Sequence, residues 1–144
     1  MSLNEFLFFK NAAGSIDTNQ NVFDLLNLMK HKYRLFLIVQ VSKDGADDHV
    51  KAKSELEKLV IAGVVKEHRV MYCTTDEGKK SMIRQLSCEL HIETDPSLIT
   101  GLARFMNKFH LVRSDLYGGK SAVAACAKEH ADKVITFRSA DNYA

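Results

Sequence analysis

Two acids follow a short apolar segment and stand where a sheet-based active site would place its metal ligands. Glu93 and Asp95 come after Leu90-His91-Ile92, and Lys79-Lys80 opens the helical pattern that precedes this segment. Carboxylate oxygens are the hard ligands that Mg²⁺ prefers, and a lysine can neutralise a nearby anion. One hypothesis is therefore that Glu93 and Asp95 hold a magnesium ion or a phosphoryl group at the end of this segment.

This spacing resembles the second half of the haloacid dehalogenase-like phosphatase pattern. In that family a lysine on the helix before the fourth strand neutralises a nucleophilic aspartate, and acids after that strand hold magnesium. Lys80 and the acids Glu93 and Asp95 match these places, and Ser42 stands where the family has its phosphate-binding Ser or Thr.

The first half of that pattern is missing. The family nucleophile is the first aspartate of a D-x-D motif that ends the first strand, whereas the candidate strand Phe6–Phe9 leads into Lys10-Asn11. Asp17 lies further on and is not part of such a motif. Without a nucleophile, a lysine and a metal-binding acid have nothing to activate. The alternative expectation is that Asp95 caps a helix and Glu93 is exposed to water.

Two further motifs have a plain structural interpretation. Gly118-Gly119-Lys120-Ser121 resembles the end of a phosphate-binding loop, but Ser114 replaces the glycine that this motif requires, so we expect a turn and a helix start. Cys73 ends an apolar segment, and no histidine is placed by sequence to activate it, so we expect a buried thiol.

The composition is that of one ordinary globular domain, and we expect a single domain over residues 1–144. The chain has 144 residues, of which 46% are hydrophobic and 26% charged. A net charge of +2 gives no argument for nucleic acid as a partner.

Three cysteines without a C-x-x-C pair indicate reduced thiols in the cytoplasm. The longest apolar run, Leu59 to Val65, is too short to span a bilayer, and we see no secretory leader.

Apolar segments of strand length alternate with helical patterns. The clearest segment, Leu35–Val41, is almost continuously apolar, as in a strand that is buried on both faces. Shorter segments are Val70–Thr74, Leu90–Glu93, Phe109–Arg113 and Val134–Phe137. This order predicts an α/β, three-layer Rossmann-like fold: a parallel sheet of five or six strands, with Leu35–Val41 central and helices on both faces. Asp95-Pro96 is the expected start of one helix.

The segment Arg69 to Phe105 resembles the peroxisome assembly protein 22 family, particularly its plant form. The matching residues are Cys73-Thr74, Glu77-Gly78, Ile83-Arg84-Gln85-Leu86, His91-Ile92-Glu93-Thr94, Pro96 and Leu102-Ala103-Arg104-Phe105. The run from Leu56 to Val70 is also similar, so the resemblance covers about half of the chain.

This resemblance implies a Rossmann-like domain without catalysis, a pseudoenzyme that needs no cofactor and no metal. It further implies that the domain binds the peroxisomal ubiquitin-conjugating enzyme and keeps it active at the membrane for recycling of the import receptor. The implied location is the cytoplasm, or the cytosolic face of the peroxisomal membrane. Family members carry an N-terminal membrane anchor, and no such segment is visible in this sequence. The alternatives are the magnesium-dependent phosphatase, with an unrecognised nucleophile, and an unrelated α/β adaptor.

Overall fold

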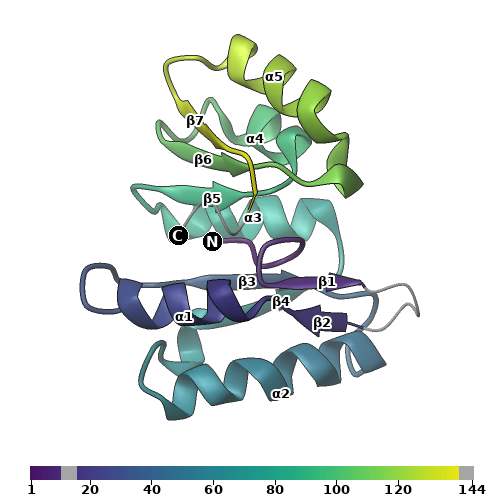
Figure 1. Ribbon diagram of the computed structural model, residues 1–144, viewed down its shortest axis with the longest axis vertical. Helices are drawn as coiled ribbons and strands as arrows, with labels where there is room; N and C mark the ends of the chain where they lie inside the picture. Colours follow the sequence, from purple (N-terminus) through teal and green to yellow (C-terminus); the bar gives the residue numbers. More distant parts are fainter. Residues whose placement is uncertain (11–15, 140–144) are drawn as a thin grey trace.

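Figure 1 shows the computed structural model of the chain, which describes residues 1–10 and 16–139. The strands are β1 (Phe8–Lys10), β2 (Ile16–Thr18), β3 (Leu37–Gln40), β4 (Val70–Cys73), β5 (His91–Glu93), β6 (Phe109–Val112) and β7 (Val134–Phe137). The helices are α1 (Gln20–Met29), α2 (Asp47–Ile61), α3 (Asp76–Leu86), α4 (Pro96–Leu102) and α5 (Gly119–Glu129). Two 3₁₀ helices, η1 (Glu67–Arg69) and η2 (Asp115–Tyr117), complete the described elements.

Side-chain caps fix the starts of several helices. Asn19 accepts hydrogen bonds from the first turn of α1, and Thr75 accepts one from Gly78 at the start of α3. Asp95 caps α4, with Pro96 at its first position, as the sequence predicts. Each cap satisfies a backbone N–H group that has no partner inside its own helix.

The strands form two parallel sheets and one antiparallel hairpin. β3 pairs with β4, and β5, β6 and β7 pair in that order, all in parallel. β1 pairs antiparallel with β2. The α/β class and the parallel pairing predicted from the sequence are confirmed.

Residues 1–3 lie between the two parallel sheets and connect them. The N–H of Leu3 donates to the carbonyl of Ile38 in β3, at 2.9 Å, and the N–H of Ile38 donates to the carbonyl of Met1, also at 2.9 Å. On the other side, the N–H of Ser2 donates to the carbonyl of Ile92 in β5 at 2.9 Å. The segment therefore takes the place of a strand between β3 and β5, although it forms only an isolated bridge with Ile38.

The prediction of one regular sheet with five or six strands is wrong in its count, because the regular sheets have two, two and three strands. The segment that joins the two parallel sheets has too few ladder hydrogen bonds to form a regular strand. The expected first strand, Phe6–Phe9, is also displaced, since β1 begins at Phe8 and belongs to the hairpin. Lys10 ends β1, whereas Asn11 lies outside the described residues.

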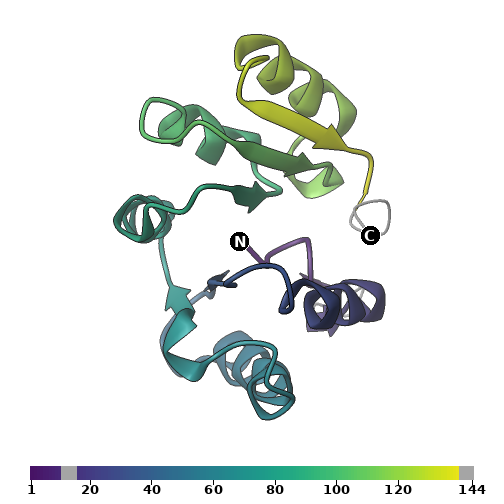
Figure 2. The same cartoon turned by 90° about the vertical axis from the view of Figure 1, so that its left-hand side faces the viewer.

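Helices cover both faces of the parallel strands, as expected (Figure 2). Alternating side chains of β3 reach two separate clusters, because successive residues of a strand point to opposite faces. Leu37 and Val39 pack in a cluster with side chains of α1 and α2, whereas Ile38 packs with side chains of α3, α4 and α5. Leu37, Ile38 and Val39 are all buried, which explains the unbroken apolar run in the sequence.

Within residues 1–10 and 16–139, no helix combines the length and the apolar character that crossing a bilayer requires.

Candidate functional site

A buried polar network surrounds Glu93 at the end of β5. Oε1 of Glu93 lies 3.7 Å from Nζ of Lys79 on α3, and Oε2 lies 2.9 Å from Nε2 of His91. The hydroxyl of Ser2 donates to Oε2 at 2.5 Å. The backbone N–H groups of Thr94 and Asp95 donate to Oε1 at 2.9 and 3.2 Å. The expectation of a water-exposed Glu93 is wrong, since its side chain has an exposure of 0%.

The network stabilises the charged form of Glu93. Burial alone raises the pKa of this carboxyl group, but the charge of Lys79 and the hydrogen bonds from His91 and Ser2 outweigh burial and lower the pKa to about 2. Burial lowers the pKa of His91 to about 4, despite its hydrogen bond to Glu93. At neutral pH, Glu93 is therefore ionised, and neutral His91 donates its Nε2–H to the carboxylate.

This geometry favours a structural role for Glu93. Both carboxylate oxygens already face donors or a cation within the protein. A metal ion at this carboxylate would have to displace Lys79 and at least one hydrogen bond. The network also ties together three parts of the chain that are distant in sequence, namely residues 1–3, α3 and β5.

Of the four residues of the phosphatase hypothesis, Ser42 and Asp95 line one cleft, whereas Lys80 and Glu93 are not among its lining residues. Lys80 pairs with Glu77 on the surface of α3 at 2.9 Å, and it is the neighbouring Lys79 that reaches Glu93. Ser42 follows β3, and its backbone N–H and its hydroxyl donate to Asp48 at 2.7 and 3.0 Å. Asp95 accepts from the N–H of Ser97 at 2.9 Å, in its role as helix cap.

Asn4 stands at the end of the segment that joins the two sheets, where the family pattern places its nucleophilic aspartate. The sequence from this position is Asn4-Glu5-Phe6 and not D-x-D. The side-chain amide donates to the carbonyl of Gln40 at 2.8 Å and accepts from the N–H of Gln40 at 2.8 Å. Asn4 thus connects residues 1–3 to the end of β3 through two hydrogen bonds that need an amide.

A cleft of about 450 Å³ lies beside Asn4, beyond the ends of the parallel strands. Its wall includes residues that follow β3, β4, β5 and β6, together with side chains of the β1–β2 hairpin. The acids that line it are Glu5, Asp48, Asp76 and Asp95. Within the described ranges, however, no group of three or more His, Cys, Asp and Glu side chains is arranged to hold a metal ion.

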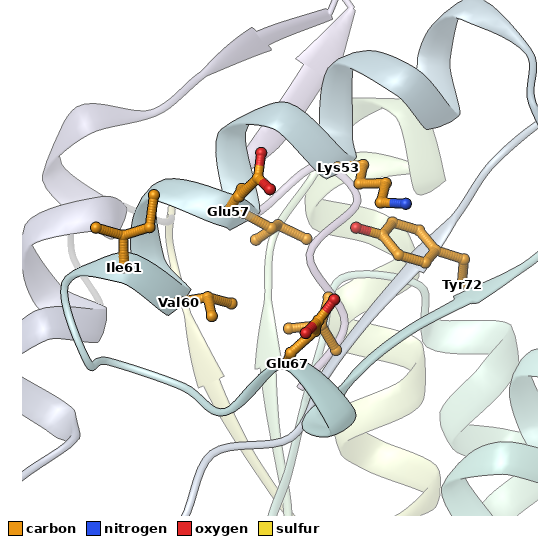
Figure 3. A pocket seen from close by; sticks show the side chains of 8 residues that line it. Lys53, Glu57, Val60, Ile61, Glu67 and Tyr72 are labelled. Carbon is orange, nitrogen blue, oxygen red and sulfur yellow. The ribbon is translucent and has the colours of Figure 1, made fainter.

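A second concavity, of about 330 Å³, lies between α2, η1 and the edge strand β4 (Figure 3). Lys53, Glu57, Val60 and Ile61 reach it from α2, Glu67 from η1 and Tyr72 from β4 (Figure 3). Burial raises the pKa of Tyr72, and the nearby Glu57 adds to this effect. This second concavity is mixed in charge and lies away from the Glu93 network.

The glycine-rich motif before α5 and the Cys73 thiol have the structural roles expected from the sequence. Gly118 and Gly119 have φ values of 90° and 60° and form the turn that leads into α5. Burial raises the pKa of the Cys73 thiol, and the sulfur faces the carbonyl of Val39 at 3.8 Å. A thiol with a raised pKa is a poor nucleophile at neutral pH.

Sequence reasoning missed Ser2, Lys79 and Asn4 as members of the central polar contacts. A signal for Lys79 was present, because it lies four residues before the buried Ile83 and therefore on the same helical face. No comparable local signal marks Ser2 or Asn4, whose partners lie 91 and 36 positions away.

The parallel strands with helices on both faces define an α/β domain of the Rossmann-like class. Residues 10–131 match a family model described as peroxisome biogenesis protein 22, Haloacid dehydrogenase-like domain. The match spans most of the chain, and the chain belongs to this family.

A curated relative agrees with the family model. The chain is 33% identical over 82 residues to a protein of Arabidopsis thaliana named Peroxisome biogenesis protein 22. The aligned part covers 57% of this chain and 29% of the relative, so the match spans less than a third of that protein. The resemblance seen in the sequence is thereby confirmed.

Proposed function

We propose that this domain binds the ubiquitin-conjugating enzyme of peroxisome biogenesis and keeps it at the cytosolic face of the peroxisomal membrane. There the enzyme serves the recycling of the import receptor. The observation that carries the proposal is the family match over residues 10–131. The name of the Arabidopsis thaliana relative supports the link to peroxisome biogenesis.

The proposed role is binding without catalysis and without a cofactor. Two contacts support this part of the proposal. Asn4 occupies the place that the nucleophilic aspartate has in the haloacid dehalogenase-like phosphatase pattern. Its side chain is held by two hydrogen bonds with the backbone of Gln40. Glu93 is enclosed by Lys79, His91 and Ser2, which leaves its oxygens engaged within the protein.

The phosphatase alternative has weaker support. It requires Ser42, Lys80, Glu93 and Asp95 to act on one phosphoryl group, whereas Lys80 pairs with Glu77 and Ser42 with Asp48. The unrelated α/β adaptor has no observation in its favour beyond the fold class. Binding to the ubiquitin-conjugating enzyme is therefore the function that we put to the test.

The test is a calorimetric titration of the purified domain against the peroxisomal ubiquitin-conjugating enzyme of the same organism, together with co-elution on a sizing column. We expect one-to-one binding in the micromolar range or tighter, since a stable interface buries on the order of 1,200–2,000 Å². A cytosolic ubiquitin-conjugating enzyme of another pathway serves as the control. The absence of both heat and co-elution at micromolar concentrations would remove the proposal.

A further inference from the structure

An exposed aromatic side chain with two arginines against it lies where the ends of α3 and α4 approach each other. The guanidinium carbon of Arg84 lies 3.9 Å from the ring centroid of Phe105, and that of Arg104 lies 4.8 Å from it. Phe105 is 44% exposed, and both arginines are exposed as well. We name these three residues the Arg–Phe–Arg cluster.

Within residues 1–10 and 16–139, no carboxylate forms an ion pair with the arginines of the Arg–Phe–Arg cluster. Among the described residues, neither Arg84 nor Arg104 forms a salt bridge, whereas Arg113 pairs with Asp115 at 3.2 Å. The aromatic ring instead holds the guanidinium groups by cation–π contacts. Two fixed cations beside an exposed ring therefore face the solvent with their hydrogen-bond donors available.

A depression of about 480 Å³ adjoins Phe105 and adds further polar groups. It is lined by Ser81, Arg84, Gln85, Ser87 and Phe105. Hydroxyl, amide and guanidinium groups can all donate to a carboxylate, and no acid is among the lining residues. Positive charge, donors and an apolar ring together match a partner surface that presents carboxylates next to an apolar side chain.

This combination of arginine and aromatic side chains favours an acidic protein surface over nucleic acid as the partner. Arginine and aromatic side chains dominate the binding energy of protein interfaces, where a few residues act as anchors. Nucleic-acid binding would require a longer basic stripe, and the whole chain has a net charge of only +2. The concavity between α2, η1 and β4 contains Lys53 beside Glu57 and Glu67, so its charge is mixed, and the charged residues that line the cleft beside Asn4 are acids.

We propose that the Arg–Phe–Arg cluster is the anchor through which this domain binds an acidic surface of its partner protein. The inference rests on the function proposed above, and it assigns the contact to the ends of α3 and α4. Because a guanidinium is planar and stacks on a ring, lysine at position 84 would keep the charge but lose the stacked geometry.

The experiment measures binding of the domain variants Arg84→Ala, Arg104→Ala, Phe105→Ala and the double variant R84E/R104E to the ubiquitin-conjugating enzyme. We expect each alanine variant to weaken binding on the order of 10-fold and R84E/R104E to weaken it by about 100-fold or more. Arg84→Lys should fall between the wild type and Arg84→Ala. The affinity of the wild type should decrease with added salt more steeply than that of Arg84→Ala.

Two matched controls come from the concavity of Figure 3. Ile61 is 82% exposed there, and Ile61→Ala and Lys53→Ala should leave the affinity unchanged within about twofold. Thermal denaturation of every variant checks that the fold is retained, which we expect since the substituted side chains of the cluster are exposed.

Each outcome decides between the proposals. If all cluster variants bind the enzyme as tightly as the wild type does, the proposal of the anchor is overturned, while the proposed function stays intact. Loss of binding in Ile61→Ala but not in the cluster variants would move the interface to α2 and β4, and would also overturn the anchor. A wild type that binds duplex DNA through the cluster, and not the enzyme, would replace the protein partner by a polyanion. A wild type that does not bind the enzyme would remove both proposals together.

Discussion

The ammonium nitrogen of Lys79 lies 3.7 Å from Oε1 of Glu93, in a part of the core where the two side chains are 1% and 0% exposed. A buried pair of charges gains stability only if further groups satisfy both partners, because removing charges from water is costly. For Glu93 these groups are Ser2, His91 and the backbone after β5. The network, more than the pair by itself, makes the charge tolerable at this position.

Removal of Lys79 should destabilise the fold strongly. Lys79→Met leaves the Glu93 carboxylate buried without its cation, so we expect a loss of about 3–5 kcal/mol in the free energy of unfolding. The double variant Lys79→Met/Glu93→Gln should lose less than the sum of the two single variants, because the uncompensated charge is gone. Urea denaturation of the four proteins measures this coupling. Additive losses would contradict an interaction between the two side chains.

Acid should destabilise the domain in two successive ranges of pH. The pKa of His91 falls from 6.5 in the unfolded chain to about 4 in the folded one, so the unfolded chain takes up this proton first. Its contribution is present above about pH 6.5 and is lost as the pH falls toward 4. The pKa of Glu93 falls from 4.5 to about 2, so its contribution is lost over that lower range.

The variant His91→Gln separates these two ranges. Glutamine can still donate to Glu93 but does not titrate, so the loss of stability between about pH 6.5 and 4 should become smaller, while the lower range remains. Denaturation midpoints at stepwise lower pH give the comparison. Identical pH profiles for the variant and the wild type would refute the assignment to His91.

An aspartate at position 4 should cost stability and bring no activity. The amide of Asn4 donates to the carbonyl of Gln40, and a carboxylate at that place would repel this carbonyl. We expect Asn4→Asp to lose about 1–3 kcal/mol. Asn4→Ala, which loses both hydrogen bonds with Gln40 and adds no charge, is the control. Equal stability of Asn4→Asp and the wild type would show that the contact with Gln40 contributes little.

We predict no turnover of a generic phosphomonoester with magnesium present. Phosphoryl transfer of this class needs a nucleophilic carboxylate, and in the fold Asn4 stands in its place, after the segment that joins the two sheets. The assay compares the wild type with Asp95→Asn and Glu93→Gln. Activity that disappears in either variant would reveal a working site and refute the non-catalytic role.

Core substitutions should be costly in both parallel sheets. Leu37 is 0% exposed and Ile92 is 3% exposed, so Leu37→Ala and Ile92→Ala should each cost about 2–5 kcal/mol. Ile61→Ala, at a side chain that is 82% exposed, is the control and should change stability by less than about 0.5 kcal/mol. Unchanged denaturation midpoints for Leu37→Ala or Ile92→Ala would contradict their place in the core.

Elements with a strong local sequence pattern were predicted from the sequence. The apolar run Leu35–Val41 contains β3, and Asp95-Pro96 starts α4. The sequence analysis singled out Lys80, whereas Lys79 is the lysine that reaches Glu93. Adjacent residues on a helix point about 100° apart, and only the phase set by Ile83 identifies the buried one. The retained charge of Glu93 could not be predicted, since its donors come from three separate segments.

The segment that joins the sheets escaped prediction for a different reason. Residues 1–3 are too short to show a strand period, and the aromatic run Phe6–Phe9 gave a stronger local signal. The pairing of Leu3 with Ile38 and of Ser2 with Ile92 is decided by tertiary contacts and not by local preference.

The position of residues 1–3 has a consequence for how the chain acquires its fold during synthesis. Ser2 leaves the ribosome before Glu93, which follows 91 positions later, so at about 5–20 residues per second it waits roughly 5–18 seconds for its partner. In that interval β3 and β4 can already pair, but β5 does not yet exist. The nascent chain therefore passes through a stage in which its future centre is an open edge, where another extended chain can add and start aggregation.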